Sequence, residues 1–252
     1  MKIYSIIFSP TGGTKKSAQL LTAPWENVCE IDMITDTDKL DNISLNADDV
    51  VYISVPSFGG RVPTFAAEQL KNIKGNNALS VINAVFGNRA YEDTLLELRD
   101  IAAGCNMCCV AATATNAQHS IMPQYGTGRP DNEDKAELTD FALKIKDKIE
   151  SGSFTEVNVP GNRPYKALGK ASMLPQVDEQ CTHCGKCANE CPTGAISTDA
   201  LNITDADKCI QCLHCIATCP SKARSLDKDK VQALAEKMKP LFAERKKNEL
   251  FI

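Results

Sequence analysis

Eight of the 12 cysteines in this sequence lie within residues 181–219, in two runs with the same spacing. In each run two residues separate the first three cysteines, three residues precede the fourth, and a proline follows it. Thiolates at this spacing can curl around one face of an iron–sulfur cube. The pattern therefore predicts two [4Fe–4S] clusters and one-electron chemistry. The runs are Cys181, Cys184, Cys187, Cys191 with Pro192, and Cys209, Cys212, Cys215, Cys219 with Pro220.

In this spacing the fourth cysteine of each run ligates the other cluster. Each cluster then joins both halves of the segment, and metal binding stabilises a segment too small for a good core. We expect the first cluster on Cys181, Cys184, Cys187 and Cys219, and the second on Cys209, Cys212, Cys215 and Cys191.

Zinc is the main alternative, because paired CxxC motifs often supply its thiolates. Two complete four-cysteine runs, each followed by proline, are less typical of zinc, so we favour clusters. His183 and His214 lie between these cysteines. We expect both on the surface, since eight thiolates already satisfy two clusters. The segment closely resembles bacterial two-cluster ferredoxins over about residues 176–227.

Four cysteines lie outside the runs. Cys105, Cys108 and Cys109 stand near the start of an apolar run, and Cys29 stands in another. Free cysteines commonly behave as small core hydrophobes, and we expect this of all four. For Cys105, Cys108 and Cys109, a third redox site is the alternative.

A second candidate site follows the apolar run Ile3–Phe8, before a predicted helix. Paired glycines allow a tight turn with exposed N–H groups, and hydroxyls add donors. In an open α/β sheet this first loop aims a helix N-terminus at a bound phosphate. Neither G-x-x-x-x-G-K-[ST] nor G-x-G-x-x-G is present, so we expect a single terminal phosphate; an ordinary strand–helix loop is the alternative. The loop is Ser9, Pro10, Thr11, Gly12, Gly13 and Thr14.

This loop resembles the flavodoxin phosphate loop, [ST]-x-T-G-x-T, which binds the phosphate of FMN. The resemblance implies that two later segments clasp the flavin ring, with Phe58 or Tyr91 stacked on it and backbone groups near Gly59 and Gly87 at its polar edge. Asn88 stands where flavodoxins often have an acidic residue. The segments are Pro56, Ser57, Phe58, Gly59, Gly60, Arg61, and Phe86, Gly87, Asn88, Arg89, Ala90, Tyr91.

Two further polar residues follow the last predicted strand. His119 would lie at the functional end of the sheet, either near the flavin or as an ordinary loop residue. Arg129 either docks the second domain or is solvated.

The elements that must position these sites alternate between strand and helix patterns. Apolar runs without strict alternation are typical of strands buried on both faces, as in a parallel sheet. Helical patterns over 91–102 and 138–149 alternate with them. We expect a doubly wound α/β fold over residues 1–150, and the flavodoxin resemblance implies five parallel strands in the order 2-1-3-4-5. The predicted strands are Ile3–Phe8, Val28–Ile34, Val50–Val55, Leu79–Phe86 and Met107–Thr115.

The rest of the chain divides into three parts. Prolines and glycines in residues 151–175 predict a linker. Residues 176–227 form the predicted two-cluster ferredoxin domain, and residues 228–252 a C-terminal helix in which Pro240 is a candidate kink. The apolar stripe of that helix, Val231 to Phe242, either packs on a domain or forms a homodimer contact.

Composition fits an ordinary globular protein. The 252 residues carry a net charge of −4, from 28 basic and 32 acidic residues, so nothing indicates a nucleic-acid partner. No apolar run reaches the ~20 residues of a membrane helix. The short run Met1–Phe8 is typical of a buried strand rather than a signal peptide, so we expect a cytoplasmic protein with reduced thiols.

Together the two parts resemble the flavodoxin–ferredoxin fusion proteins of anaerobic bacteria and archaea, the EFR-type ferredoxin family. The resemblance implies intracellular electron transfer between two [4Fe–4S] clusters and FMN, with a redox protein as donor or acceptor. It would couple one-electron carriers to two-electron flavin chemistry. The alternatives are an FMN-dependent reductase of a small acceptor and a non-catalytic redox sensor. No catalytic triad or acid pair stands out, so whether the chain is an enzyme stays open.

Overall fold

A twisted parallel sheet forms the centre of the N-terminal part in the computed structural model, which describes residues 1–152, 154–169 and 172–252. Its first five strands are parallel and follow the order β2-β1-β3-β4-β5. This confirms the predicted doubly wound α/β fold, in which the strand order reverses between β1 and β3. The strands are β1 (Ile3–Ile7), β2 (Val28–Asp32), β3 (Val50–Pro56), β4 (Leu79–Phe86) and β5 (Cys108–Asn116).

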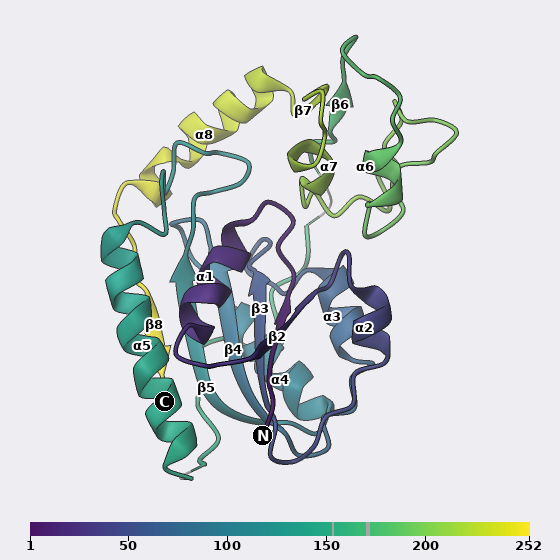
Figure 1. Cartoon of the computed structure of the whole chain (residues 1–252). Helices are drawn as coiled ribbons and strands as arrows, with labels where there is room; N and C mark the ends of the chain where they lie inside the picture. The colour runs from purple at the N-terminus through teal and green to yellow at the C-terminus, as the bar shows by residue number, and fades with distance from the viewer. Residues whose placement is uncertain (153, 170–171) are drawn as a thin grey trace.

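Helices cover both faces of this sheet (Figure 1). On one face Leu21 and Leu138 belong to a buried core with residues of the central strands. On the other face Leu70, Leu95 and Leu98 form a second core. Two apolar layers explain why the central strands are continuous hydrophobic runs. The helices are α1 (Gly13–Thr22) and α5 (Asn132–Glu150) on the first face, and α2 (Thr37–Asp41), α3 (Thr64–Leu70) and α4 (Thr94–Gly104) on the second.

The edge strand β2 corrects one expectation. Cys29 is exposed rather than buried in a core. β2 pairs with β1 on one side only and is the edge strand of the sheet. Most side chains of an edge strand are less buried than those of the central strands, and only Ile31 of β2 is fully buried. Cys105 and Cys109, in contrast, are buried, and burial raises the pKa of both thiols.

The cysteine-rich segment has little regular structure of its own. It contains the two-residue strands β6 (Gln176–Val177) and β7 (Arg224–Ser225), which pair with each other, and the single turns α6 (Lys186–Asn189) and α7 (His214–Ala217). Figure 1 shows it beyond the carboxyl ends of the parallel strands. The predicted linker 151–175 leads to it; residues 153, 170 and 171 of that linker lie outside the described part.

The C-terminal residues return to the N-terminal sheet, which the sequence did not predict. Helix α8 (Lys228–Phe242) leaves the cysteine-rich segment, and strand β8 (Glu249–Phe251) then pairs antiparallel with β5. The expected five-stranded sheet therefore has six strands, and the expected helix over 228–252 ends at Phe242. The apolar stripe of α8 packs on Met122 and neighbouring residues of the chain's own loop after β5.

A buried polar cluster holds this C-terminal segment. Arg129 forms an ion pair with Asp134, 2.5 Å between Nη2 and Oδ1, and both side chains are at most 3% exposed. Arg129 also donates to the Lys246 carbonyl at 2.7 Å. Asn248 accepts the backbone N–H of Asn116 at 2.8 Å and donates to Asp134 at 2.9 Å. Arg129 is thus a buried anchor rather than a solvated loop residue.

The chain's helices are too short or too polar to cross a membrane, as far as residues 1–152, 154–169 and 172–252 show.

Candidate functional site

Two small cavities in the cysteine-rich segment are each lined by four cysteines. Each set contains three cysteines of one run and the fourth of the other. These cysteines surround a cavity instead of meeting at one point: within the described residues, no group of three or more His, Cys, Asp or Glu side chains could hold a single metal ion. One cavity is lined by Cys181, Cys184, Cys187 and Cys219, the other by Cys209, Cys212, Cys215 and Cys191.

Left-handed backbone turns bend each run around its cavity. His183 and Gly185 in the first run have φ of 55° and 75°, and Gln211 and Leu213 occupy the same places in the second with φ of 52° and 63°. Such φ values let the chain reverse between successive cysteines, at a cost for residues other than glycine. The repeated conformations give the two runs pseudo-symmetric shapes.

The two sets differ in burial. Cys184 of the first set is exposed, whereas Cys215 of the second is buried. Leu213, buried beside the second cavity, stands where the first run has Gly185. The first set is thus the outer one and the second the inner one.

Burial affects the protonation of two thiols of the inner set. Burial raises the pKa of Cys212 to about 12 and that of Cys215 to about 11. At neutral pH these groups are protonated unless a metal displaces the protons, as it does when thiolates ligate it. Four thiols that line one small, nearly apolar cavity are a donor set of the kind that an iron–sulfur cluster requires.

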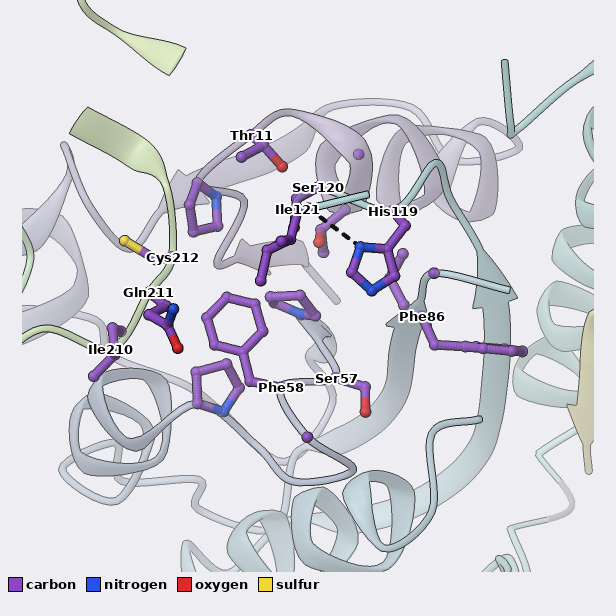
Figure 2. Close-up of a pocket in the computed structure, with 18 of the residues that line it drawn as sticks. Thr11, Ser57, Phe58, Phe86, His119, Ser120, Ile121, Ile210, Gln211 and Cys212 are labelled. Carbon is purple, nitrogen blue, oxygen red and sulfur yellow. Dashed lines mark hydrogen bonds between the residues drawn. The ribbon is translucent and has the colours of Figure 1, made fainter. Parts of the chain in front are cut away.

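A much larger cavity, of about 530 Å³, lies between the sheet and the inner cysteines. It is lined by the loops after β1, β3 and β5, by the end of β4, and by residues 206–212 of the cysteine-rich segment. Figure 2 shows Phe58, His119 and Gln211 around it. The predicted residues that line it are Pro10, Thr11, Gly13, Thr14, Pro56, Ser57, Phe58, Gly59, Phe86 and Gly87.

The loop after β1 presents backbone donors to this cavity. Ser9 Oγ accepts the N–H of Lys15 at 2.9 Å, and the Gly12 carbonyl accepts that of Lys16 at 3.2 Å. The N–H groups of Gly13 and Thr14, in the first turn of α1, then have no partner among the described residues. Gly12 has φ of 88°, which strongly favours glycine. Free N–H groups at a helix N-terminus suit an anionic group such as a phosphate.

Six residues of the two predicted ring segments lie outside the lining of the large cavity, namely Gly60, Arg61, Asn88, Arg89, Ala90 and Tyr91. Other contacts hold four of them. Tyr91 donates its hydroxyl to Glu249 at 3.0 Å, and Arg61 pairs with Glu97 at 2.7 Å. Asn88 donates to the Glu244 carbonyl at 3.0 Å, and Gly60 packs closely on Glu92. Of the two predicted stacking residues, Phe58 is therefore the one at the cavity. Ser9 and Gly12 shape the loop without lining the cavity.

His214 is not on the surface as expected. Its side chain is only 12% exposed, and its Nδ1 donates to the Pro10 carbonyl at 3.0 Å. Its Nε2 lies 3.4 Å from Glu190 Oε2 but makes no hydrogen bond. This contact joins the second cysteine run to the loop after β1. Sequence reasoning missed it because no local pattern relates residues 10 and 214. It also missed the cavity-lining residues Ala206, Asp207, Ile210 and Gln211, whose place depends on how the two halves pack.

Comparison with known families supports the chemistry of the cysteine-rich segment. Residues 180–223 match the family model described as a 4Fe–4S dicluster domain. This part of the chain is a ferredoxin-type 4Fe–4S domain, and electron transfer is the function it indicates.

Several solved structures match part of the chain. Rubredoxin oxygen:oxidoreductase from Desulfovibrio gigas is 14% identical with a TM-score of 0.42; the match covers 60% of this chain and 36% of that one. A flavodoxin of Streptococcus pneumoniae is 15% identical with a TM-score of 0.39, covering 58% of this chain and 97% of that one. Megasphaera elsdenii flavodoxin is 15% identical with a TM-score of 0.35, covering 56% and 98%. No curated protein matches the chain.

Proposed function

We propose that this chain is an electron-transfer protein that couples two [4Fe–4S] clusters to one FMN. The observation that carries the proposal is that Cys209 and Cys212 line both the inner cysteine cavity and the large cavity. A cluster held by these cysteines would adjoin whatever fills the large cavity. Electron exchange requires such closeness between redox centres.

Each cluster would take four thiolates from both runs. Cys181, Cys184, Cys187 and Cys219 would hold the outer cluster, and Cys209, Cys212, Cys215 and Cys191 the inner one. Because Cys184 is exposed, an external redox protein would exchange electrons at the outer set. The inner set faces the large cavity instead.

The large cavity suits a flavin mononucleotide. A volume of about 530 Å³ falls within the range of sites that bind cofactors. The free N–H groups of Gly13 and Thr14 and the hydroxyl of Thr11 would receive the phosphate. Phe58 would contact the ring, with Ser57, Gly59 and Gly87 at its edges. A bound FMN accepts one or two electrons, whereas a cluster passes one at a time.

A second candidate function is an FMN-dependent reductase of a small acceptor. The observation that favours it is Leu168, which lines the large cavity and is 48% exposed, so the cavity reaches the surface. A small acceptor could approach the cavity from that side.

Rapid mixing of the anaerobically loaded chain with a reduced small ferredoxin tests the proposal, with the FMN absorbance as the signal. We expect flavin reduction in the wild-type chain and a loss of at least about tenfold in rate for Cys212→Ala and Cys184→Ala, because each removes a ligand of one cluster. Cys29→Ala is the matched control, since that exposed thiol is in β2. Flavin reduction at an unchanged rate in both ligand variants would contradict the proposed coupling.

A further inference from the structure

One polar side chain of the large cavity has no role in the proposal so far. His119 follows β5 and lines the cavity. Its Nδ1 accepts the backbone N–H groups of Ile121 at 3.2 Å and Met122 at 3.1 Å. Figure 2 shows one of these bonds beside the ring, on the side of Ser120 and Ile121.

These two bonds fix the tautomer of the imidazole. A nitrogen that accepts N–H donors must carry the lone pair, so the ring proton is on Nε2. Nε2 has no hydrogen-bond partner in residues 1–152, 154–169 and 172–252. Burial lowers the pKa of His119 to about 4, and the positive charge of Arg89 adds to this effect. The ring is therefore a neutral N–H donor at neutral pH.

Packing restrains the ring as well. A Cβ added at Gly87 would lie 2.8 Å from His119 Cδ2, so the ring lies directly against the end of β4. On another side Phe242 of α8 packs edge-on, with ring centroids 5.4 Å apart and planes at 72°. A donor held by two backbone bonds and two packing contacts loses little entropy when it binds an acceptor.

We propose that His119 donates a hydrogen bond from Nε2 to an acceptor atom of the FMN ring system. This inference rests on the proposed FMN function. The ring end is indicated because His119 lies against Gly87, at the end of β4, whereas the phosphate donors belong to the loop after β1. A neutral donor stabilises electron density that the ring gains on reduction, and it does so without adding a positive charge. His119 thus favours binding of the reduced cofactor over the oxidised one.

Two substitutions separate this role from a structural one. His119→Asn keeps an acceptor near the place of Nδ1, which preserves the loop, but it is too short to replace the Nε2 donor. His119→Gln extends an amide N–H to about the place of Nε2. The dissociation constants of oxidised and reduced FMN would be measured for the wild type and both variants, by flavin absorbance under controlled potential.

We expect His119→Asn to weaken binding of reduced FMN about tenfold more than binding of oxidised FMN, which lowers a two-electron potential by about 30 mV. His119→Gln should restore most of the difference. The inference would be overturned if the ratio of the two dissociation constants changed equally in both variants, or changed in neither. If wild-type protein does not bind FMN at all, the proposed function fails instead, so the two failures are distinguishable.

A second readout is independent of redox state. In protein labelled with ¹⁵N-histidine, the ¹⁵N chemical shift of His119 Nε2 should be that of a protonated ring nitrogen before FMN is added. This chemical shift should change when FMN binds. A resonance that stays in place while FMN saturates the protein would also overturn the inference.

Discussion

The bond between His214 and Pro10 connects the cysteine-rich segment directly to the loop after β1. His214 lies between two inner cysteines, and Pro10 lines the large cavity. The Pro10 carbonyl is the acceptor, so His214 must hold its proton on Nδ1. A loss of this bond would loosen both cofactor sites at once.

His214→Leu should therefore weaken the docking of the two parts by about 1 kcal/mol, the usual net value of one hydrogen bond. Hydrogen exchange measured by mass spectrometry in the loaded protein should become about fivefold faster in residues 9–14 and 206–215. Lys186→Leu is the matched control, because Lys186 is exposed at the equivalent place of the first run. Similar exchange in both variants would show that the bond contributes nothing.

Leu213 and Gly185 show how one residue can make two related sites unequal. Both adopt left-handed backbone, which is easy for glycine and strained for leucine. Leu213 nevertheless is buried beside the inner cysteines. The strain is offset by apolar burial, and the result is a drier environment for the inner set than for the outer one. Solvent exposure is one of the factors that set cluster potentials.

Among the elements, α8 and β8 tie the cysteine-rich segment to the sheet. Strand β8 pairs with β5 at the edge of the sheet. The side chain of Asn248, just before β8, belongs to the buried polar cluster with Arg129 and Asp134. This anchor places α8, and with it Phe242, against the loop that carries His119. The position of a cavity residue thus depends on the last residues of the chain.

Asn248→Ala should lower the free energy of unfolding by about 2 kcal/mol. The substitution leaves the buried N–H of Asn116 without a partner and removes a donor from the Asp134 carboxylate. Urea unfolding would measure the change. Lys247→Ala, at the exposed neighbouring residue, should stay within about 0.5 kcal/mol of the wild type. A midpoint for Asn248→Ala equal to that of Lys247→Ala would refute the anchoring role.

The same cluster predicts a pH dependence. Burial would raise the pKa of Asp134, but hydrogen bonds from Arg129 and Asn248 outweigh it, so the folded pKa lies below its usual value. A carboxyl with a lowered folded pKa stabilises the fold above the unfolded pKa of about 4 and loses that contribution as pH falls through the folded value. Hydrogen exchange of Leu250 in β8 should therefore show constant protection, after correction for intrinsic rates, between about pH 6 and pH 5, and weaker protection as pH falls from about 4 to about 2. In Asp134→Asn the protection should be lower at pH 6 and should change less. Parallel pH profiles in the two proteins would contradict this assignment.

The sequence predicted the elements whose signals are local and missed those set by distant contacts. Strands such as Val50–Pro56 and Leu79–Phe86 are long β-branched or apolar runs, and their pattern alone identifies them. Strand β8 has three residues, too few for any period, and it is fixed by partners more than a hundred residues away. The resemblance to flavodoxins places Tyr91 at the ring because it follows β4, but its hydroxyl is held by Glu249 of that unpredicted strand.

For the candidate site, spacing was informative where ligands are close in sequence. The cysteine runs were recognisable because a cluster needs thiolates at short, fixed intervals. The large cavity was predicted only from its N-terminal side. Its other wall, residues 206–212, comes from the packing of the two parts, which no local pattern encodes.

In the whole molecule, the outer cysteines, the inner cysteines and the large cavity follow one another from the surface to the end of the sheet. The inner cysteines are the shared wall, because Cys209 and Cys212 line the cavities on both sides. The sheet, the linker and the C-terminal segment keep these parts together. This arrangement would bring one-electron carriers and a flavin into one chain.

The content of anaerobically purified protein tests this account most directly. Iron, acid-labile sulfide and flavin would be quantified for each chain. The account predicts about eight iron, about eight sulfide and about one FMN, as two four-iron clusters and one flavin site require. Protein that contains zinc and no acid-labile sulfide, or full clusters without any flavin, would contradict it.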